Sequence, residues 1–367
     1  MKPIYLDYAA TTPVDSDAFK AALPYYKSIF YNPSSTHALG RKAFAAVEKA
    51  RVKCADAVNC KPNEIYFTSG GTEAINWALK CVENGGKKHI LISAIEHDSV
   101  LACAKKLQKI GYTVDTVMPT SGGTITPEAL AKAVTADTAL VCVMTVNNQT
   151  GAIQPVRELA AIAHNVGALF FTDAVQAVNA TKIDVEDMGV DLLAVSGHKF
   201  YAPKGVGFLY VKSGVKFDGF IDGGSQEKEK RAGTENVPAI VAMGEAIEKA
   251  RQTVNDYNAH IKSVSNAFLS EICGKPIACD NKIDDIVSVV FDGVNGGRLA
   301  VALSLAGVCC SVGSACSAGS AVVPPTLAAM GIENADCAVR FSFGRSTTED
   351  EAKRAAKIVN QTVKKLS

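Results

Sequence analysis

Short apolar runs alternate with longer amphipathic stretches through most of the chain. Apolar runs of about four to eight residues are typical of buried strands, and apolar positions three or four residues apart are typical of helices. The amphipathic stretches predict helices over residues 74–82, 99–110, 127–134 and 156–166. The apolar runs predict strands over residues 64–68, 89–93, 112–117, 139–146, 169–172, 191–195 and 208–211. This alternation favours an α/β fold with a largely parallel sheet covered by helices.

The two ends of the chain predict a second, smaller lobe. One long helical pattern covers residues 237–268, with a break or bend near Asn255. A short strand begins at Tyr5, and helices are expected from residue 19 and from residue 37 to about residue 58. After the long helix the pattern predicts strands at 286–291 and 338–343 and helices at 298–306 and 349–366. We therefore expect a large domain over residues 14–250 and a small domain over residues 1–13 and 251–367.

Composition excludes several classes of protein. The chain has 367 residues, of which 48% are hydrophobic and 20% charged, and its net charge is +1. This is the profile of a globular protein large enough for two lobes, and the charge gives no reason to expect a nucleic-acid partner. No apolar run reaches membrane-spanning length, and the N-terminus lacks the apolar core of a signal peptide. We expect a cytoplasmic protein.

The eleven cysteines are irregularly spaced and include no Cys-x-x-Cys pair. A zinc ribbon or a redox pair is therefore not indicated, and no metal site is predicted. Cys81, Cys103 and Cys142 lie in apolar surroundings and are expected to be small core residues. A non-enzymatic thiol or metal-binding protein remains an alternative from another class, weakened by the lack of closely spaced ligand pairs.

Lys199 lies in the loop Ser196-Gly197-His198-Lys199, between the predicted strands 191–195 and 208–211. A lysine in such a place loses hydration, which lowers its pKa and makes the amine nucleophilic. The alternative is an ordinary surface lysine.

A second candidate is Ser69-Gly70-Gly71-Thr72-Glu73, which follows a strand and opens a helix. Free N–H groups and the helix dipole point the same way there, and they favour a bound anion. Simple capping of the helix by Ser69 or Thr72 explains the motif equally well.

Further polar residues follow the predicted parallel strands. They are Glu96-His97, Asn147-Asn148-Gln149, Asp173 with Gln176, and Ser196 to Lys199. Parallel sheets bind ligands at the carboxyl ends of their strands, so these side chains are expected to converge. This set of residues suits pyridoxal 5'-phosphate. It offers a lysine for a Schiff base, an aspartate for the pyridine nitrogen, a turn for the phosphate and an imidazole ring to stack on the pyridine.

These motifs resemble a known family. Together with Leu6-Asp7-Tyr8-Ala9-Ala10-Thr11-Thr12, they are similar to those of the class V aminotransferase fold group, and within it to the cysteine desulfurases of the nitrogen-fixation and iron–sulfur-cluster type. The resemblance extends from Tyr5 to the last helix. It implies a PLP-dependent, aminotransferase-like fold of type I, with a mainly parallel seven-stranded sheet in the large domain and a smaller α/β domain.

The resemblance also implies a role for each residue. Lys199 would hold pyridoxal 5'-phosphate as a Schiff base and move protons, and His97 would stack on the ring and act in acid–base steps. Asn148 and Arg340 would hold the substrate carboxylate. Asp173 and Gln176 would contact the ring, and the phosphate would be held by Gly71, Thr72, Ser196, His198 and, from the partner chain of a homodimer, Thr234.

Cys316 would take the sulfur of L-cysteine as a persulfide, with release of alanine to solution and later transfer of sulfur to an acceptor protein. It lies in the small-residue run 311–320, so we expect an exposed and mobile thiol. A packed core cysteine, the expectation for Cys309 and Cys310, is the alternative. A selenocysteine lyase or another PLP enzyme of the same fold remains open. The chain stops soon after its last predicted helix, whereas members that serve a scaffold protein typically carry a longer tail, so the acceptor is not identified.

Overall fold

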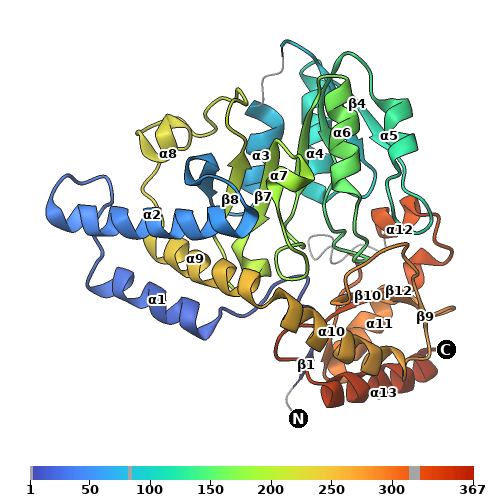
Figure 1. Ribbon diagram of the computed structural model, residues 1–367. Coiled ribbons are helices and arrows are strands. Elements are labelled where there is room, and N and C mark those ends of the chain that lie inside the picture. The colour runs from blue at the N-terminus through green and yellow to red at the C-terminus, as the bar shows by residue number, and fades with distance from the viewer. Residues whose placement is uncertain (1–2, 82–84, 314–322) are drawn as a thin grey trace.

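A computed structural model describes residues 3–81, 85–313 and 323–367 of the protein (Figure 1). Its largest element is a seven-stranded sheet with the strand order β2-β8-β7-β6-β5-β3-β4. The strands are β2 (Ile65–Thr68), β3 (His89–Ser93), β4 (Thr113–Val117), β5 (Thr138–Cys142), β6 (Leu169–Asp173), β7 (Leu192–Ser196) and β8 (Gly207–Val211). The five strands from β4 to β7 are parallel to their neighbours, whereas β8 is antiparallel to both β2 and β7. The predicted mainly parallel sheet is confirmed.

One predicted strand is too long. The apolar run 139–146 was expected to be a single strand, but β5 ends at Cys142. Val143 and Thr145 still donate backbone hydrogen bonds to β6. On the other side, the backbone N–H of Met144 donates to the carboxylate of Glu96 instead of to a strand, because β3 has already ended at Ser93. At this point the buried side chain of Glu96 thus takes the place of a neighbouring strand as the hydrogen-bond acceptor.

Two hydrophobic cores cover opposite faces of the sheet. Neighbouring residues of one strand enter different cores, as Phe170 and Phe171 do, which is the two-residue period of a strand buried on both faces. Helices α3 (Gly71–Cys81) and α4 (Asp98–Lys109) contribute to one core. The other core includes residues of α1 (Ser16–Lys27), α2 (Ala38–Val58), α5 (Pro127–Ala133), α6 (Val156–Asn165), α7 (Val185–Met188) and α9 (Val237–Gln252).

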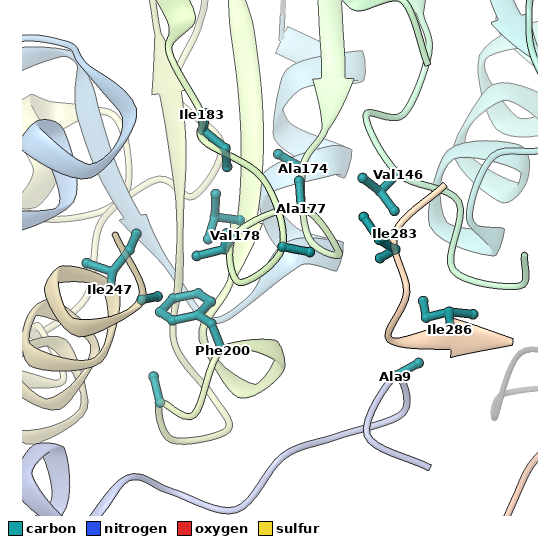
Figure 2. Packing of buried hydrophobic residues seen from close by; sticks show 14 of the residues in the cluster. Ala9, Val146, Ala174, Ala177, Val178, Ile183, Phe200, Ile247, Ile283 and Ile286 are labelled. Carbon is teal, nitrogen blue, oxygen red and sulfur yellow. The ribbon is translucent and has the colours of Figure 1, made fainter. Parts of the chain in front are cut away.

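The second core also fixes the chain around Lys199. Phe200, the next residue, is fully buried. Figure 2 shows its ring among Val178 and Ile247, with Ala174 and Ala177 on the neighbouring loop. A buried ring directly after the lysine restricts where the lysine backbone can lie.

The C-terminal part forms the predicted smaller lobe. Strands β9 (Lys275–Pro276), β10 (Ile286–Val290) and β12 (Ala338–Ser342) make an antiparallel sheet, and β1 (Ile4–Tyr5) pairs with β11 (Val308–Cys309). The N-terminal strand therefore pairs with a strand of the C-terminal part. The lobe's helices are α10 (Val254–Leu269), α11 (Gly296–Leu305), α12 (Pro325–Ala329) and α13 (Glu349–Leu366). The domain boundaries given above stay a prediction.

The long helical pattern forms two helices, α9 and α10, that meet at Thr253, two residues before the expected break. Within the described ranges, no helix is both long and apolar enough to cross a membrane. The remaining short elements are the turn α8 (Gln226–Glu229) and the 3-10 turns Pro62–Glu64, Gly197–Lys199 and Ala335–Cys337.

Candidate active site

A cavity of about 480 Å³ lies where the carboxyl ends of the parallel strands meet the N-terminal segment and β12. Lys204, Gly205 and the backbone of residues 9–11 also line it. The cavity brings together nearly all of the residues that the sequence singled out: Gly71, Thr72, His97, Asn148, Asp173, Gln176, Ser196, His198, Lys199 and Arg340. The expected convergence at the strand ends is therefore a feature of the fold.

Lys199 is at the end of a 3-10 turn that directly follows β7. Its Nζ donates hydrogen bonds to the backbone carbonyls of Ala9, at 2.5 Å, and Ala10, at 2.9 Å. The turn is tightly packed, because a Cβ on Gly197 would come within 3.0 Å of Val206 Cγ1 and 3.1 Å of Ala202 Cβ. The side chain is half-buried on the cavity wall, so the alternative of an ordinary surface lysine is wrong.

Asp173 ends β6 and is only 4% exposed. Its Oδ1 accepts a hydrogen bond from the backbone N–H of Val175 at 2.8 Å. Burial raises the pKa of Asp173, and its electrostatic interactions with His97 and Lys199 act in the opposite direction. A cationic ring nitrogen bound beside this carboxylate would stabilise its charged form.

His97 caps the N-terminus of α4. Its Nδ1 accepts a hydrogen bond from the backbone N–H of Ser99 at 3.1 Å and lies 2.7 Å from Ser99 Oγ. Because Nδ1 is an acceptor here, the neutral ring carries its proton on Nε2. The cap fixes the orientation of the imidazole at the edge of the cavity.

The glycine turn places the N-terminus of α3 on the cavity. A Cβ on Gly71 would lie 2.9 Å from Val175 Cγ2 and 3.3 Å from Ser196 Cβ, so only glycine lets the helix end approach β6 and β7 this closely. The backbone N–H of Ser69 donates to Glu73 Oε2 at 2.9 Å. Thr68 Oγ1 accepts from the backbone N–H of Gly70 at 3.3 Å, so the side-chain acceptors of this turn are Glu73 and Thr68 instead of the Ser69 or Thr72 that the capping alternative required.

His198 faces the cavity beside two lysines. Burial, and then the charges of Lys199 and Lys204, lower the pKa of His198 from 6.5 to about 4. Its Nδ1 lies 3.2 Å from Thr11 Oγ1. The imidazole is therefore neutral at pH 7 and can serve as a hydrogen-bonding group for an anion.

Arg340 presents a buried guanidinium from β12, with 2% of the residue exposed. Nη1 donates to the backbone carbonyl of Asn148 at 2.8 Å, and Nη2 donates to Asp7 Oδ1 at 3.1 Å. Nε is buried and has no hydrogen-bond partner among the residues that the structure describes. Burial lowers the pKa of Arg340, and the Asp7 carboxylate opposes this effect. A cation held this way has unused hydrogen-bonding capacity for a second carboxylate.

Sequence reasoning missed two acidic residues at the site. Asp7 was part of a quoted motif but received no role. Glu96 was named only as a neighbour of His97, yet it is buried behind the cavity and its Oε1 accepts hydrogen bonds from Ser93 Oγ, at 2.5 Å, and from the Met144 N–H, at 2.7 Å. Burial raises the pKa of Glu96 to about 8. The available signal was their position shortly after strands, since Asp7 lies two residues after β1 and Glu96 three residues after β3.

Three predicted features lie elsewhere. Thr234 is exposed and does not line the cavity of its own chain. Cys316 and most of its small-residue run lie outside the described residues, so its expected mobility stays a prediction. Cys103 and Cys142 are buried as expected, whereas Cys81, the last residue of α3, is partly exposed. Its Sγ donates to the carbonyl of Gly219 at 3.6 Å. Among the described residues, no group of three or more His, Cys, Asp or Glu side chains is placed to hold a metal ion.

The fold and cavity define a two-lobed α/β protein in which a lysine, a buried aspartate and a helix N-terminus face one site. The aminotransferase class-V family matches residues 4–354, and the chain belongs to that family. It is 38% identical to the cysteine desulfurase IscS of Methanosarcina thermophila over 100% of this chain and 93% of that protein. It is 40% identical to the cysteine desulfurase IscS of Dictyoglomus turgidum, over 100% and 95%.

Solved structures show the same likeness. A NifS-like protein superimposes with a TM-score of 0.94 at 34% identity, over 99% of this chain and 100% of that one. SspA in complex with cysteine gives a TM-score of 0.80 at 32% identity, over 93% and 98%. The predicted family and fold type are confirmed.

Proposed function

We propose that this protein is a pyridoxal-phosphate-dependent cysteine desulfurase that converts L-cysteine to L-alanine and passes the sulfur to Cys316 for iron–sulfur cluster or thio-cofactor synthesis. The observation that carries the proposal is the presence of Lys199, Asp173 and the glycine turn of α3 on one cavity. The names of its relatives, cysteine desulfurase, support the same reaction.

The residues on the cavity fit pyridoxal 5'-phosphate. The N-terminus of α3, with Thr72, Ser196 and the neutral His198, supplies donors for a phosphate. Asp173, which burial leaves without enough compensating charge, matches a protonated pyridine nitrogen. Lys199 would supply the amine, Gln176 would contact the ring, and His97 would supply an aromatic face. When bound, the cofactor would act as an electron sink for the bonds around the substrate's Cα.

The remaining residues fit an amino-acid substrate. Arg340, with Asn148 beside it, would bind the carboxylate and so fix which substrate bonds face the lysine. The Lys199 amine would then carry a proton between substrate carbons. The Cys316 thiolate would attack the substrate sulfur, so that an S–S bond forms, the C–S bond breaks, and the carbon takes a proton to give alanine. Gly313 and Pro324, on either side of the Cys316 segment, line a small cavity with His97 and Asn148, so the described chain on both sides of that segment borders the site.

The test is single-turnover incubation with L-cysteine, with alanine and protein-bound sulfur measured together. Wild type should release one alanine per site and carry the sulfur on Cys316, as mapped by mass spectrometry. Cys316→Ala should bind the cofactor but give neither product. Alanine release that does not need Cys316 would refute the assignment, and activity restricted to selenocysteine would favour a selenocysteine lyase. Bound metal without the visible absorbance of the cofactor would favour the thiol or metal-binding alternative.

We further propose that the enzyme is a homodimer whose partner chain contributes Thr234 to the phosphate site. Large apolar side chains are exposed along α1, α2 and the loop between them, which suits an interface with a second copy: Phe19, Tyr26, Phe30 and Phe44. Thr234→Ala should weaken cofactor retention without changing the oligomeric state, as measured by light scattering. A fully active monomer at assay dilution would contradict the shared site. An acceptor protein for the sulfur is also expected, and its identity is open.

A further inference from the structure

The chain between β8 and α9 contains a left-handed turn made of three residues that are not glycine. Glu227, Lys228 and Glu229 have φ values of 46°, 60° and 62°. Side chains with a Cβ rarely adopt this region, and three in succession persist only where the surroundings hold them. The turn is labelled α8 in Figure 1, where it lies at the end of the large lobe near α2.

The first residue of the turn is bonded to the outer edge of β2. Glu227 is 6% exposed, and its carboxylate accepts two hydrogen bonds from the Arg51 guanidinium, both at 2.8 Å. Glu227 Oε2 also accepts from the backbone N–H of Phe67 at 2.9 Å, and Arg51 Nη1 donates to the carbonyl of Ile65 at 2.9 Å. β2 is an edge strand, so this ion pair occupies the donor and acceptor that a further strand would use.

Arg231, just after the turn, is hydrogen-bonded to Glu73, on the helix side of the glycine motif. Arg231 Nε donates to Glu73 Oε1 at 2.8 Å, and Nη2 donates to Glu73 Oε2 at 3.2 Å. The same Oε2 accepts from the backbone N–H of Ser69. Glu227 thus binds the strand before the motif Ser69–Gly71, and Arg231 binds the first turn of the helix after it.

We propose that residues 227–231 form a brace that positions the glycine turn for a phosphate group, with Glu227 and Arg231 as positioning residues for cofactor binding. Phosphate binding at a helix N-terminus requires several backbone N–H groups to converge on one point. The strand before the turn, β2, has a neighbouring strand, β8, on one side only, and the brace supplies support on the other side. The proposal rests on the proposed function, because the phosphate is that of pyridoxal 5'-phosphate.

The test compares the affinities of the cofactor-free protein for pyridoxal 5'-phosphate and for pyridoxal, which lacks the phosphate. Glu227→Gln should weaken the binding of pyridoxal 5'-phosphate by about tenfold and leave the affinity for pyridoxal unchanged. A loss of about this size is typical when a residue that orients a ligand-binding group is replaced. Glu73→Gln keeps an acceptor for Ser69 but removes the ion pair, so it should show the same selective loss if Glu227→Gln does not fold. Glu229→Gln, an exposed change in the same turn, is the matched control and should bind both compounds normally.

An equal loss for both compounds would show general destabilisation and overturn the brace. The brace would also be overturned if Glu227→Gln and Glu73→Gln both kept the wild-type affinities for the two compounds. Failure of the proposed function is a separate result, because wild type would then bind neither compound.

Discussion

Replacing Glu96 with glutamine should make the protein more resistant to unfolding at alkaline pH. Glu96 is fully buried against Ser93 and Met144, and its Oε2 has no hydrogen-bond partner. Burial is the main reason that its pKa rises from 4.5 to about 8, and the charge of Asp173 adds to the effect. An acid whose pKa is raised by folding stabilises the fold fully below its unfolded pKa, and that contribution is lost as the pH rises through the folded pKa. The window here runs from about pH 4.5 to pH 8.

The size of the effect follows from the two pKa values. For a carboxyl group that moves from 4.5 to about 8, linkage gives a loss of about 4 kcal/mol between pH 5 and pH 9. Glutamine does not ionise, so the variant escapes this loss. Its amide leaves a second N–H without a partner, which costs about 1 kcal/mol at every pH. The variant should therefore be slightly less stable than wild type at pH 5 and about 3 kcal/mol more stable at pH 9.

Chemical unfolding of the cofactor-free protein from pH 5 to pH 9 measures this difference, because all other titrating groups are common to both proteins. Glu64→Gln is the control of opposite sign. Burial would raise the pKa of Glu64, but hydrogen bonds from the side chain of Ser213 and from the N–H groups of Lys61 and Ser213 outweigh it and hold the pKa below its usual value. That variant should lose stability at neutral pH. Parallel curves for wild type and Glu96→Gln across the whole range would refute a neutral, buried Glu96.

Three other substitutions test the site and the brace. Lys199→Ala should keep the fold and the affinity for the cofactor's phosphate but lose the covalent attachment of the cofactor, which borohydride reduction makes permanent and mass spectrometry detects. A variant that still carries the reduced cofactor would mean that another lysine is the anchor. Asp173→Asn should bind cofactor yet lower turnover on the order of 10²-fold or more, as measured by alanine release, and near-normal turnover would remove Asp173 from its role. Glu229→Gly relieves a φ of 62° at an exposed position and should raise the free energy of unfolding by about 0.5–1 kcal/mol, whereas a lower melting temperature would show that the turn is not strained.

Much of the fold and site could be predicted because strand ends are visible in the sequence. An apolar run followed by a polar residue places Asp173 and Lys199 at one edge of a parallel sheet, and no tertiary detail is needed for that. The reversed direction of β8 was not predicted, although only ten residues separate it from β7, too few for the usual helical crossover between parallel strands.

The environments of Glu96 and Glu227 could not be predicted in this way. Each carboxylate takes its character from groups far away in the chain: Met144 for Glu96, and Arg51 with Phe67 for Glu227. The local sequence pattern predicts an ordinary charged residue in both cases. Only the packing of the folded chain makes Glu96 neutral and pairs Glu227 with an arginine.

The N-terminal segment connects Arg340 and Lys199, which lie on the same cavity. Leu6 accepts a backbone hydrogen bond from Ser342 on the small lobe, and Thr12 donates one to His198 on the large lobe. Between these points Asp7 holds the Arg340 guanidinium, and the carbonyl of Ala9 accepts from both Lys199 and Gln176. Arg340, the proposed carboxylate anchor, and Lys199 are therefore both tied to one short stretch of backbone that crosses between the lobes. Arg340 also contacts the large lobe directly, through the hydrogen bond from its Nη1 to the carbonyl of Asn148. The N-terminal stretch and this direct contact therefore together hold Arg340 and Lys199 on the same cavity.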